Sequence, residues 1–100
     1  MRTMLKVSIP VQAGNRAIKD GSLPKLMSSV MDQLHPEAAY FYPENGKRTT
    51  LMVFDMKDPS QIPAVAEPFF MGLDAEISLT PVMNAADLKA GLESSAKSRG

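Results

Sequence analysis

The sequence predicts a small α+β domain, in which helices cover one face of an antiparallel β-sheet. The first observation is Asn45-Gly46 between two strand-like runs, because Asn-Gly is the strongest short-range signal for a two-residue β-hairpin. The second is an alternation of apolar and polar residues both early and late in the chain, which is typical of half-buried strands. The third is a pair of segments, one on each side of the hairpin, whose apolar residues recur at helical spacing.

The first predicted strand lies near the start of the chain. Its apolar positions are Leu5, Val7, Ile9 and Val11, and these alternate with Lys6, Ser8, Pro10 and Gln12. The sequence Ala13-Gly14-Asn15 breaks this strand. A helical stretch then opens near Asn15 and is interrupted around Gly21.

The first main helix is predicted to begin near Ser22, which is suited to be its N-cap, and Pro24 is tolerated in the first turn. Its buried side is one apolar stripe, made of Leu23, Leu26, Met27, Val30, Met31 and Leu34. His35-Pro36 ends the helix, because a residue that precedes proline disfavours the α conformation.

The hairpin fixes the partner of each residue in its two strands, residues 38–43 and 48–56. With Asn45-Gly46 as the turn, Glu44 lies opposite Lys47, Tyr42 opposite Thr49, Tyr40 opposite Leu51 and Ala38 opposite Val53. Side chains of a strand alternate between the two faces of the sheet. The register therefore also assigns every side chain of both strands to a face.

A second main helix follows the hairpin and leads into the last strand. Asp58-Pro59-Ser60-Gln61 is a strong helix start, with Asp58 as N-cap and Gln61 able to bond back to it. The buried stripe is expected to be Ile62, Val65, Ala66, Phe69 and Leu73, while Pro63 and Pro68 predict a kinked or divided helix that ends at Gly72 or Asp74. Ile77, Leu79 and Pro81 mark the last strand, and Asn84 to Asp87 cap a short terminal helix that carries Leu88 and Leu92.

This order of elements predicts a ferredoxin-like βαββαβ antiparallel sheet with both main helices on one face, followed by the short C-terminal helix. Residues 1–93 form a single domain, and the polar residues 94–100 are expected to be a frayed tail. The helix-covered face is predicted to hold Leu5, Val7, Ile9, Ala39, Phe41, Met52, Phe54, Ile77 and Leu79.

The opposite face of the sheet is mixed, and it has two interpretations. It contains Lys6, Ser8, Tyr40, Tyr42, Leu51, Val53, Asp55, Glu76, Ser78 and Thr80. Antiparallel sheets normally carry polar residues toward solvent, and the face could be such a surface. However, Tyr40, Leu51 and Val53, together with Met4, would form an apolar patch that a soluble monomer avoids. We favour a homodimer through this face, whose two sheets enclose a barrel-like space with Lys6, Asp55 and Glu76 inside it or at its rim.

Length and composition exclude several classes of protein. The chain has 100 residues, enough for one small domain, and carries 11 positive and 11 negative side chains. Zero net charge argues against nucleic acid or an anionic membrane as a partner. There is no cysteine, which removes disulfides, thiolate nucleophiles and Cys-ligated metals. No apolar run approaches the ~20 residues of a membrane span, and no signal-peptide pattern opens the chain, so we expect a cytoplasmic protein.

Several stretches resemble a known family. They are MLKVSIPVQAGN (residues 4–15), PEAAYF (36–41), SQIPAVAEPFF (60–70) and PVM (81–83). In them the chain resembles a family of short, largely uncharacterised bacterial proteins within the ferredoxin-like dimeric α/β-barrel superfamily. The resemblance implies that fold but no established reaction, because the superfamily includes quinol monooxygenases without cofactors, muconolactone-isomerase-like enzymes, haem-degrading proteins and stress-responsive barrels. Haem-degrading members rely on an Asn, Trp and His set, and this chain has no Trp.

Four side chains are candidates for proton transfer: Tyr40, Asp55, Glu67 and His35. His35 is the only histidine, but its place at a helix end is equally explained by the helix dipole. Glu67 precedes Pro68-Phe69-Phe70, and burial against Phe69 would raise its pKa, although a surface glutamate is the simpler interpretation. Tyr40 is the best single candidate for a ligand contact, unless it only covers a dimer interface.

The residues that we expect to bind a ligand are Lys6, Tyr40, Asp55, Glu76 and Phe69. One histidine and scattered carboxylates do not make a metal site by spacing, so neither a metal nor a cofactor is predicted. The first hypothesis is a homodimeric binding or stress-related protein that takes a small, apolar or aromatic molecule. The second is a cofactor-independent monooxygenase or isomerase that acts on an aromatic or enol-like substrate. The third is a structural dimer module without a ligand.

Overall fold

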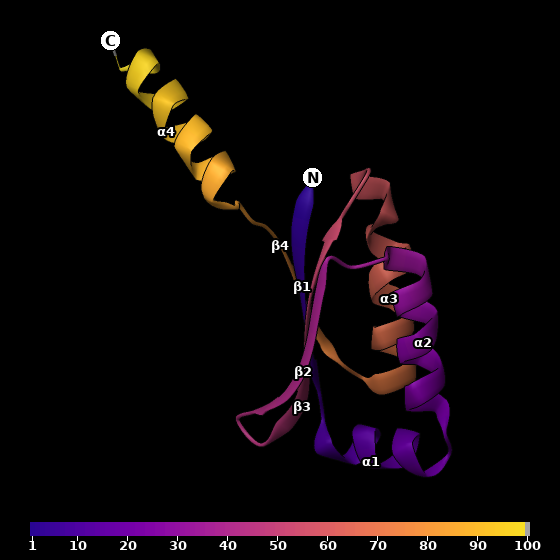
Figure 1. Cartoon of the computed structure of the whole chain (residues 1–100). Helices are drawn as coiled ribbons and strands as arrows, with labels where there is room; N and C mark the ends of the chain where they lie inside the picture. The colour runs from indigo at the N-terminus through magenta and orange to yellow at the C-terminus, as the bar shows by residue number, and fades with distance from the viewer. Residues whose placement is uncertain (100) are drawn as a thin grey trace.

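The protein, described here over residues 1–99 by a computed structural model, is an α+β domain with one four-stranded antiparallel sheet. The elements are β1 (Arg2–Ile9), α1 (Val11–Lys19), α2 (Ser22–Leu34), β2 (Ala38–Glu44), β3 (Lys47–Asp55), a 3-10 turn η1 (Pro59–Gln61), α3 (Ile62–Leu73), β4 (Glu76–Pro81) and α4 (Ala85–Ser98). The strand order is β2-β3-β1-β4, and α1, α2 and α3 lie on one side of the sheet (Figure 1). The arrangement is compatible with the predicted ferredoxin-like fold.

The Asn45-Gly46 turn is confirmed, together with the register that it predicts. Asn45 has φ 54° and Gly46 has φ 76°, the two positive values that a type I′ turn requires. Glu44 pairs with Lys47, and the pairing continues without a slip to Ala38 and Val53. The turn therefore determines which side chains of β2 and β3 face the helices.

The core lies between the sheet and the three helices that cover it. In β1 every second residue is buried, and β1 pairs with both β3 and β4, so that Leu5 and Val7 each lie between a buried residue of β3 and a half-buried residue of β4. Leu5, for example, lies between Met52 and Leu79. Each fully buried aliphatic or aromatic side chain contributes about 1.5–3 kcal/mol. The fully buried core residues include Leu5, Val7, Met52, Phe54, Phe69 and Leu73.

The two main helices follow their predicted stripes closely. On α2 Val30 is buried, and the other residues of the stripe pack against the core. The helix ends at His35, which adopts the left-handed conformation with φ 45°. Asp58 and Gln61 form the predicted capping box, and the helix is divided where η1 meets α3 rather than at Pro68, which lies inside α3. Asp74, with φ 50°, ends α3.

Two predicted helix starts are wrong. The first strand ends at Ile9, and α1 begins at Val11, so that Val11 is an exposed helical residue rather than a strand residue. Pro10 separates the two, because proline cannot donate to a sheet ladder but is tolerated where a helix begins. Ser22 is the first residue of α2 and not its cap, since Gly21 takes the cap position with φ 80°.

Contrary to the prediction, Gly14 does not end the first strand but lies inside α1, under the side chain of Arg48. A Cβ atom at Gly14 would come within 2.7 Å of the Arg48 Nη1 atom and 3.3 Å of Ile9. Arg48 also donates a hydrogen bond of 3.1 Å from its Nη2 atom to Asn15 Oδ1. The glycine thus permits a close approach between α1 and the hairpin.

The helices do not cover the whole of the sheet face against which they pack. Phe41 points to the helix side, as predicted, but 57% of it is exposed because β2 is an edge strand. Ile62, at the start of the α3 stripe, is also exposed. Both edge strands contain a proline, Pro43 in β2 and Pro81 in β4.

The last helix, α4, stands apart from the domain (Figure 1). Asn84 and Asp87 form its predicted capping box, but none of its residues is buried. The described part of the chain has a radius of gyration of 16.2 Å, against ~13 Å for a compact chain of this length. The helix reaches Ser98, into the segment from Ser94 for which the sequence predicts a frayed tail; Gly100 lies outside the described residues.

Gly46→Ala should lower the free energy of unfolding by about 1–2 kcal/mol, because a Cβ atom is disfavoured in the left-handed conformation. Urea unfolding followed by circular dichroism measures the change. Gly46→Asn is the matched control, because Asn adopts the left-handed conformation more readily than Ala does. An equal stability for Gly46→Ala and the natural chain would contradict the type I′ turn.

Candidate functional site

The sheet has one face that the helices α1, α2 and α3 leave uncovered, and we refer to it as the open face. Its side chains are Arg2, Met4, Lys6, Ser8, Ala38, Tyr40, Tyr42, Glu44, Lys47, Thr49, Leu51, Val53, Asp55, Glu76, Ser78 and Thr80. The central row runs across all four strands from Tyr40 through Leu51 and Lys6 to Ser78. All the strands thus supply side chains to this face.

The middle of the open face is apolar. Tyr40 is 63% exposed, and Met4, Leu51 and Val53 are half-buried. Met4 pairs with Val53, which places these two side chains next to each other on β1 and β3. The predicted apolar patch is therefore present, in contact with the polar groups of the same face.

A polar hollow of about 320 Å³ lies on the open face beside the hairpin turn. We call it the hairpin hollow, and its lining residues are Lys6, Ser8, Glu44, Asn45, Lys47, Glu76, Ile77 and Ser78. Lys6 and Glu44 form an ion pair across it, with 2.6 Å between Lys6 Nζ and Glu44 Oε2. The hydrogen bond to Glu44 raises the pKa of Lys6, so that the amine stays protonated. The hollow therefore presents two ammonium groups, two carboxylates and two hydroxyls to a bound molecule.

Of the five predicted ligand-binding residues, the structure brings Lys6 and Glu76 together in the hairpin hollow. Glu76 pairs with Ser8, which is two residues from Lys6 along β1 and therefore the next side chain on the same face. Tyr40 lies in the same row as Lys6 but two strands away, roughly 10 Å at the usual strand spacing. It therefore belongs to the apolar middle of the open face and does not line the hollow.

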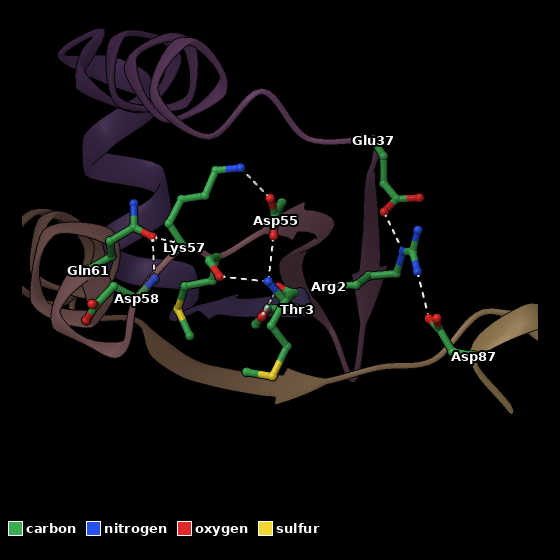
Figure 2. Close-up of polar contacts among 10 residues, drawn as sticks. Arg2, Thr3, Glu37, Asp55, Lys57, Asp58, Gln61 and Asp87 are labelled. Atoms are coloured by element: carbon green, nitrogen blue, oxygen red, sulfur yellow. Dashed lines mark hydrogen bonds and ion pairs between the residues drawn. The ribbon is translucent and has the colours of Figure 1, made fainter. Parts of the chain in front are cut away.

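Asp55 is at the other end of the sheet, where it anchors the start of the chain. Its carboxylate accepts a hydrogen bond of 2.6 Å from the amino group of Met1 and another from Lys57 (Figure 2). The Lys57 ammonium, and after it the amino group of Met1, lowers the pKa of Asp55 to about 2. Asp55 also lies four residues from Leu51 along β3, roughly 13 Å from the central row. It is a structural ion-pair partner, distant from Lys6.

The remaining candidate residues lie on other parts of the molecule. Phe69 is fully buried in the core beneath α3, away from the open face. Glu67 is exposed on α3, so the burial on which a proton-transfer role for it depends is not present. His35 is exposed at the end of α2, where its backbone N–H donates to the carbonyl of Met31. The four candidates for proton transfer thus do not share a site.

A second hollow was not predicted from the sequence. This edge groove, of about 310 Å³, lies between the start of α2 and the edge strand β2, and its walls are mainly apolar. It is lined by Ile9, Leu23, Met27, Phe41, Tyr42, Pro43, Arg48, Thr49 and Thr50. The signal in the sequence is that β2 carries aromatic residues on both faces, with Tyr40 and Tyr42 on one and Phe41 on the other. How far α2 covers Phe41 depends on tertiary packing, which periodicity does not reveal.

The stability of the domain should fall in acid through Asp55. Its pKa is lowered from 3.8 to about 2 in the folded state, so its contribution is present above pH 3.8 and is lost as the pH falls through about 2. The melting temperature of Asp55→Asn should therefore fall less than that of the natural chain between pH 3.8 and about 2. Asp32→Asn, an exposed residue of α2, is the control with the same change of charge. Identical pH profiles for the two variants would contradict the role of Asp55, and the effect should shrink in high salt.

Among residues 1–99, no group of three or more His, Asp or Glu side chains is placed to hold a metal ion. The helices of the same region are all too short or too polar to cross a membrane. A comparison with models of known protein families finds none that matches the chain, and a search of curated proteins finds no match either. The family resemblance therefore remains a prediction.

Proposed function

We propose that the protein is a homodimer that binds a small molecule between the open faces of two copies. The observation that carries this proposal is the apolar middle of the open face, where Tyr40 is 63% exposed next to half-buried aliphatic side chains. Contiguous apolar surface of this kind marks an interaction site on a soluble protein. In a two-fold dimer the same patch meets itself, so one exposed face is enough to build the interface.

The hairpin hollow suggests the chemistry of the ligand. Lys6 and Lys47 can bind a carboxylate, and the hydroxyls of Ser8 and Ser78 can orient it. The apolar middle of the face begins next to Lys6 at Leu51 and continues to Tyr40. A small aromatic acid, with its carboxylate in the hollow and its ring along this row, fits both features.

The positions of the candidate acids and bases favour binding over catalysis. Tyr40 is on the open face, Asp55 is held by two ammonium groups, and Glu67 and His35 lie on the helices. A general base must lie within hydrogen-bond reach of the proton that it removes. Because these groups do not converge, the proposal assigns none of them to proton transfer.

The dimer is tested by introducing a charge on the open face. We expect the natural chain to be a dimer at micromolar concentration in light scattering after size exclusion, and Tyr40→Lys to weaken the dimer by tenfold or more. Tyr40 is mostly exposed, so this change should leave the fold of one copy intact. Met71→Lys is the control, because Met71 is an exposed apolar residue on α3. A natural chain that is monomeric at micromolar concentration would overturn the proposal.

The ligand is tested by a thermal-shift screen with aromatic acids, quinols and lactones. An aromatic acid should raise the melting temperature, and Lys6→Met should weaken its binding about 10–100-fold, the value of a hydrogen bond to a charged group. Lys25→Met, on the exposed side of α2, is the matched control. Stabilisation without turnover supports a binding protein. Turnover that Tyr40→Phe abolishes would mean an enzyme, and no stabilisation by any compound would favour a structural dimer.

A further inference from the structure

Helix α4 carries an apolar stripe that nothing in residues 1–99 covers. Leu88 and Leu92 are one turn apart on the same side of the helix and are 46% and 59% exposed. Met83, in the segment that leads into the helix, is 65% exposed. The opposite side carries Glu93 and Lys97, so the helix has one apolar and one charged side.

This helix has little to stabilise it on its own. It has 14 residues, and isolated helices of this length are marginal in water even for alanine-rich sequences. Gly91 and three serines lower its propensity further. In most proteins such a helix is stabilised by packing its apolar side against another element. The contacts that α4 makes within its own chain do not supply this.

The start of α4 is nevertheless held in a fixed place by Arg2. The guanidinium donates from Nη1 to Asp87 Oδ2 at 2.9 Å and from Nε to Glu37 Oε1 at 2.7 Å (Figure 2). Asp87 also accepts a hydrogen bond from the backbone N–H of Asn84 as part of the capping box. The first turn of the helix is thus tied to β1 and to the residue before β2, while its stripe of leucines stays free.

Helix α4 points toward the side of the sheet on which the open face lies (Figure 1). It leaves the sheet at the end opposite the hairpin turn and leans away from α2 and α3, toward the side of the open face (Figure 1). A second copy packed on the open face would lie on that side. We infer that α4 is an arm that packs its Leu88 and Leu92 stripe against the second copy of the chain. The inference rests on the proposed dimer and adds to it the element that completes the interface.

The size of the open face supports a second copy as the partner of α4. Four strands ~4.8 Å apart and about six residues long at ~3.3 Å each give a flat area of roughly 400 Å². A standard interface buries ~800 Å² of accessible surface on each partner, so the sheet alone reaches that size only if the relief of its side chains doubles the flat area. Two arms, one from each copy, extend the contact beyond the sheets. In a two-fold dimer each copy both gives and receives an arm, so both stripes are covered at once.

The charges of α4 do not favour a membrane as its partner. Helices that lie on membranes are rich in Lys and Arg on their polar side and carry large apolar residues on the other. In α4 Asp87 and Glu93 balance Lys89 and Lys97. Its apolar side has two leucines and otherwise small residues, which suits close packing on a protein surface.

The arm is tested in the full chain with two matched double variants. Leu88→Ser with Leu92→Ser removes the stripe, and Glu93→Ser with Lys97→Ser changes the other side of the same helix with a similar loss of helix propensity and no change of net charge. Sedimentation over a range of concentrations gives the dimer dissociation constant. We expect the leucine variant to raise it by tenfold or more and the control to change it less than threefold.

The chain has no cysteine, so a single spin label at Glu93→Cys provides a second measurement. In the dimer, pulsed electron spin resonance should show one narrow distance between the two labels, because packed arms are fixed. A broad distribution, or a dimer that the leucine variant leaves unchanged, would overturn the arm and leave the proposed dimer standing. A natural chain without any dimer would overturn both. Binding of the natural chain, but not of the leucine variant, to neutral or anionic lipid vesicles would also overturn the arm.

Discussion

The pairing of β1 with both β3 and β4 is the constraint on which the rest of the structure depends. It gives β1 a partner on each side along nearly its whole length, so its alternation of side chains is imposed on the entire sheet. A slip of one residue would turn Leu5 and Val7 outward and place Lys6 beneath the helices, where an unpaired ammonium is very costly. The same alternation that builds the core therefore puts Lys6 on the open face, where Glu44 can reach it.

The small core explains why so much apolar surface lies outside it. Three helices cover one face of the sheet, but α2 does not cover Phe41, and α4 covers nothing in its own chain. Tyr40, Phe41 and Leu92 are each more than half exposed as a result. These residues lie on three separate surfaces, and the open face and α4 are the two that a single second copy can cover together.

Local signals in the sequence predict those elements of the fold that depend on contacts between near neighbours in the chain. Asn45-Gly46 predicts the hairpin and its register, and Asp58 with Gln61 predicts the start of the second helical region, because both depend on bonds between near neighbours. The prediction of Pro10 as a strand residue is wrong, because Val11 beyond it keeps the period of two although it begins a helix. For the site, the alternation of side chains in the first and last strands places Lys6 and Glu76 on one face. One of the two partners of Asp55 is Met1, 54 residues away, and no periodicity could have indicated that contact.

The two edge strands limit the ways in which copies of this chain can associate. Pro43 in β2 and Pro81 in β4 each remove a backbone donor from an edge that would otherwise be open to another strand. Continuous sheets that grow from molecule to molecule, and the fibres that result from them, are disfavoured at both edges. In the proposed dimer the open faces of two copies meet, and α1, α2 and α3 would cover the other face of each sheet (Figure 1), so association through the sheets would stop at two copies. The prolines disfavour growth of the sheet at its edges without taking part in that proposed interface.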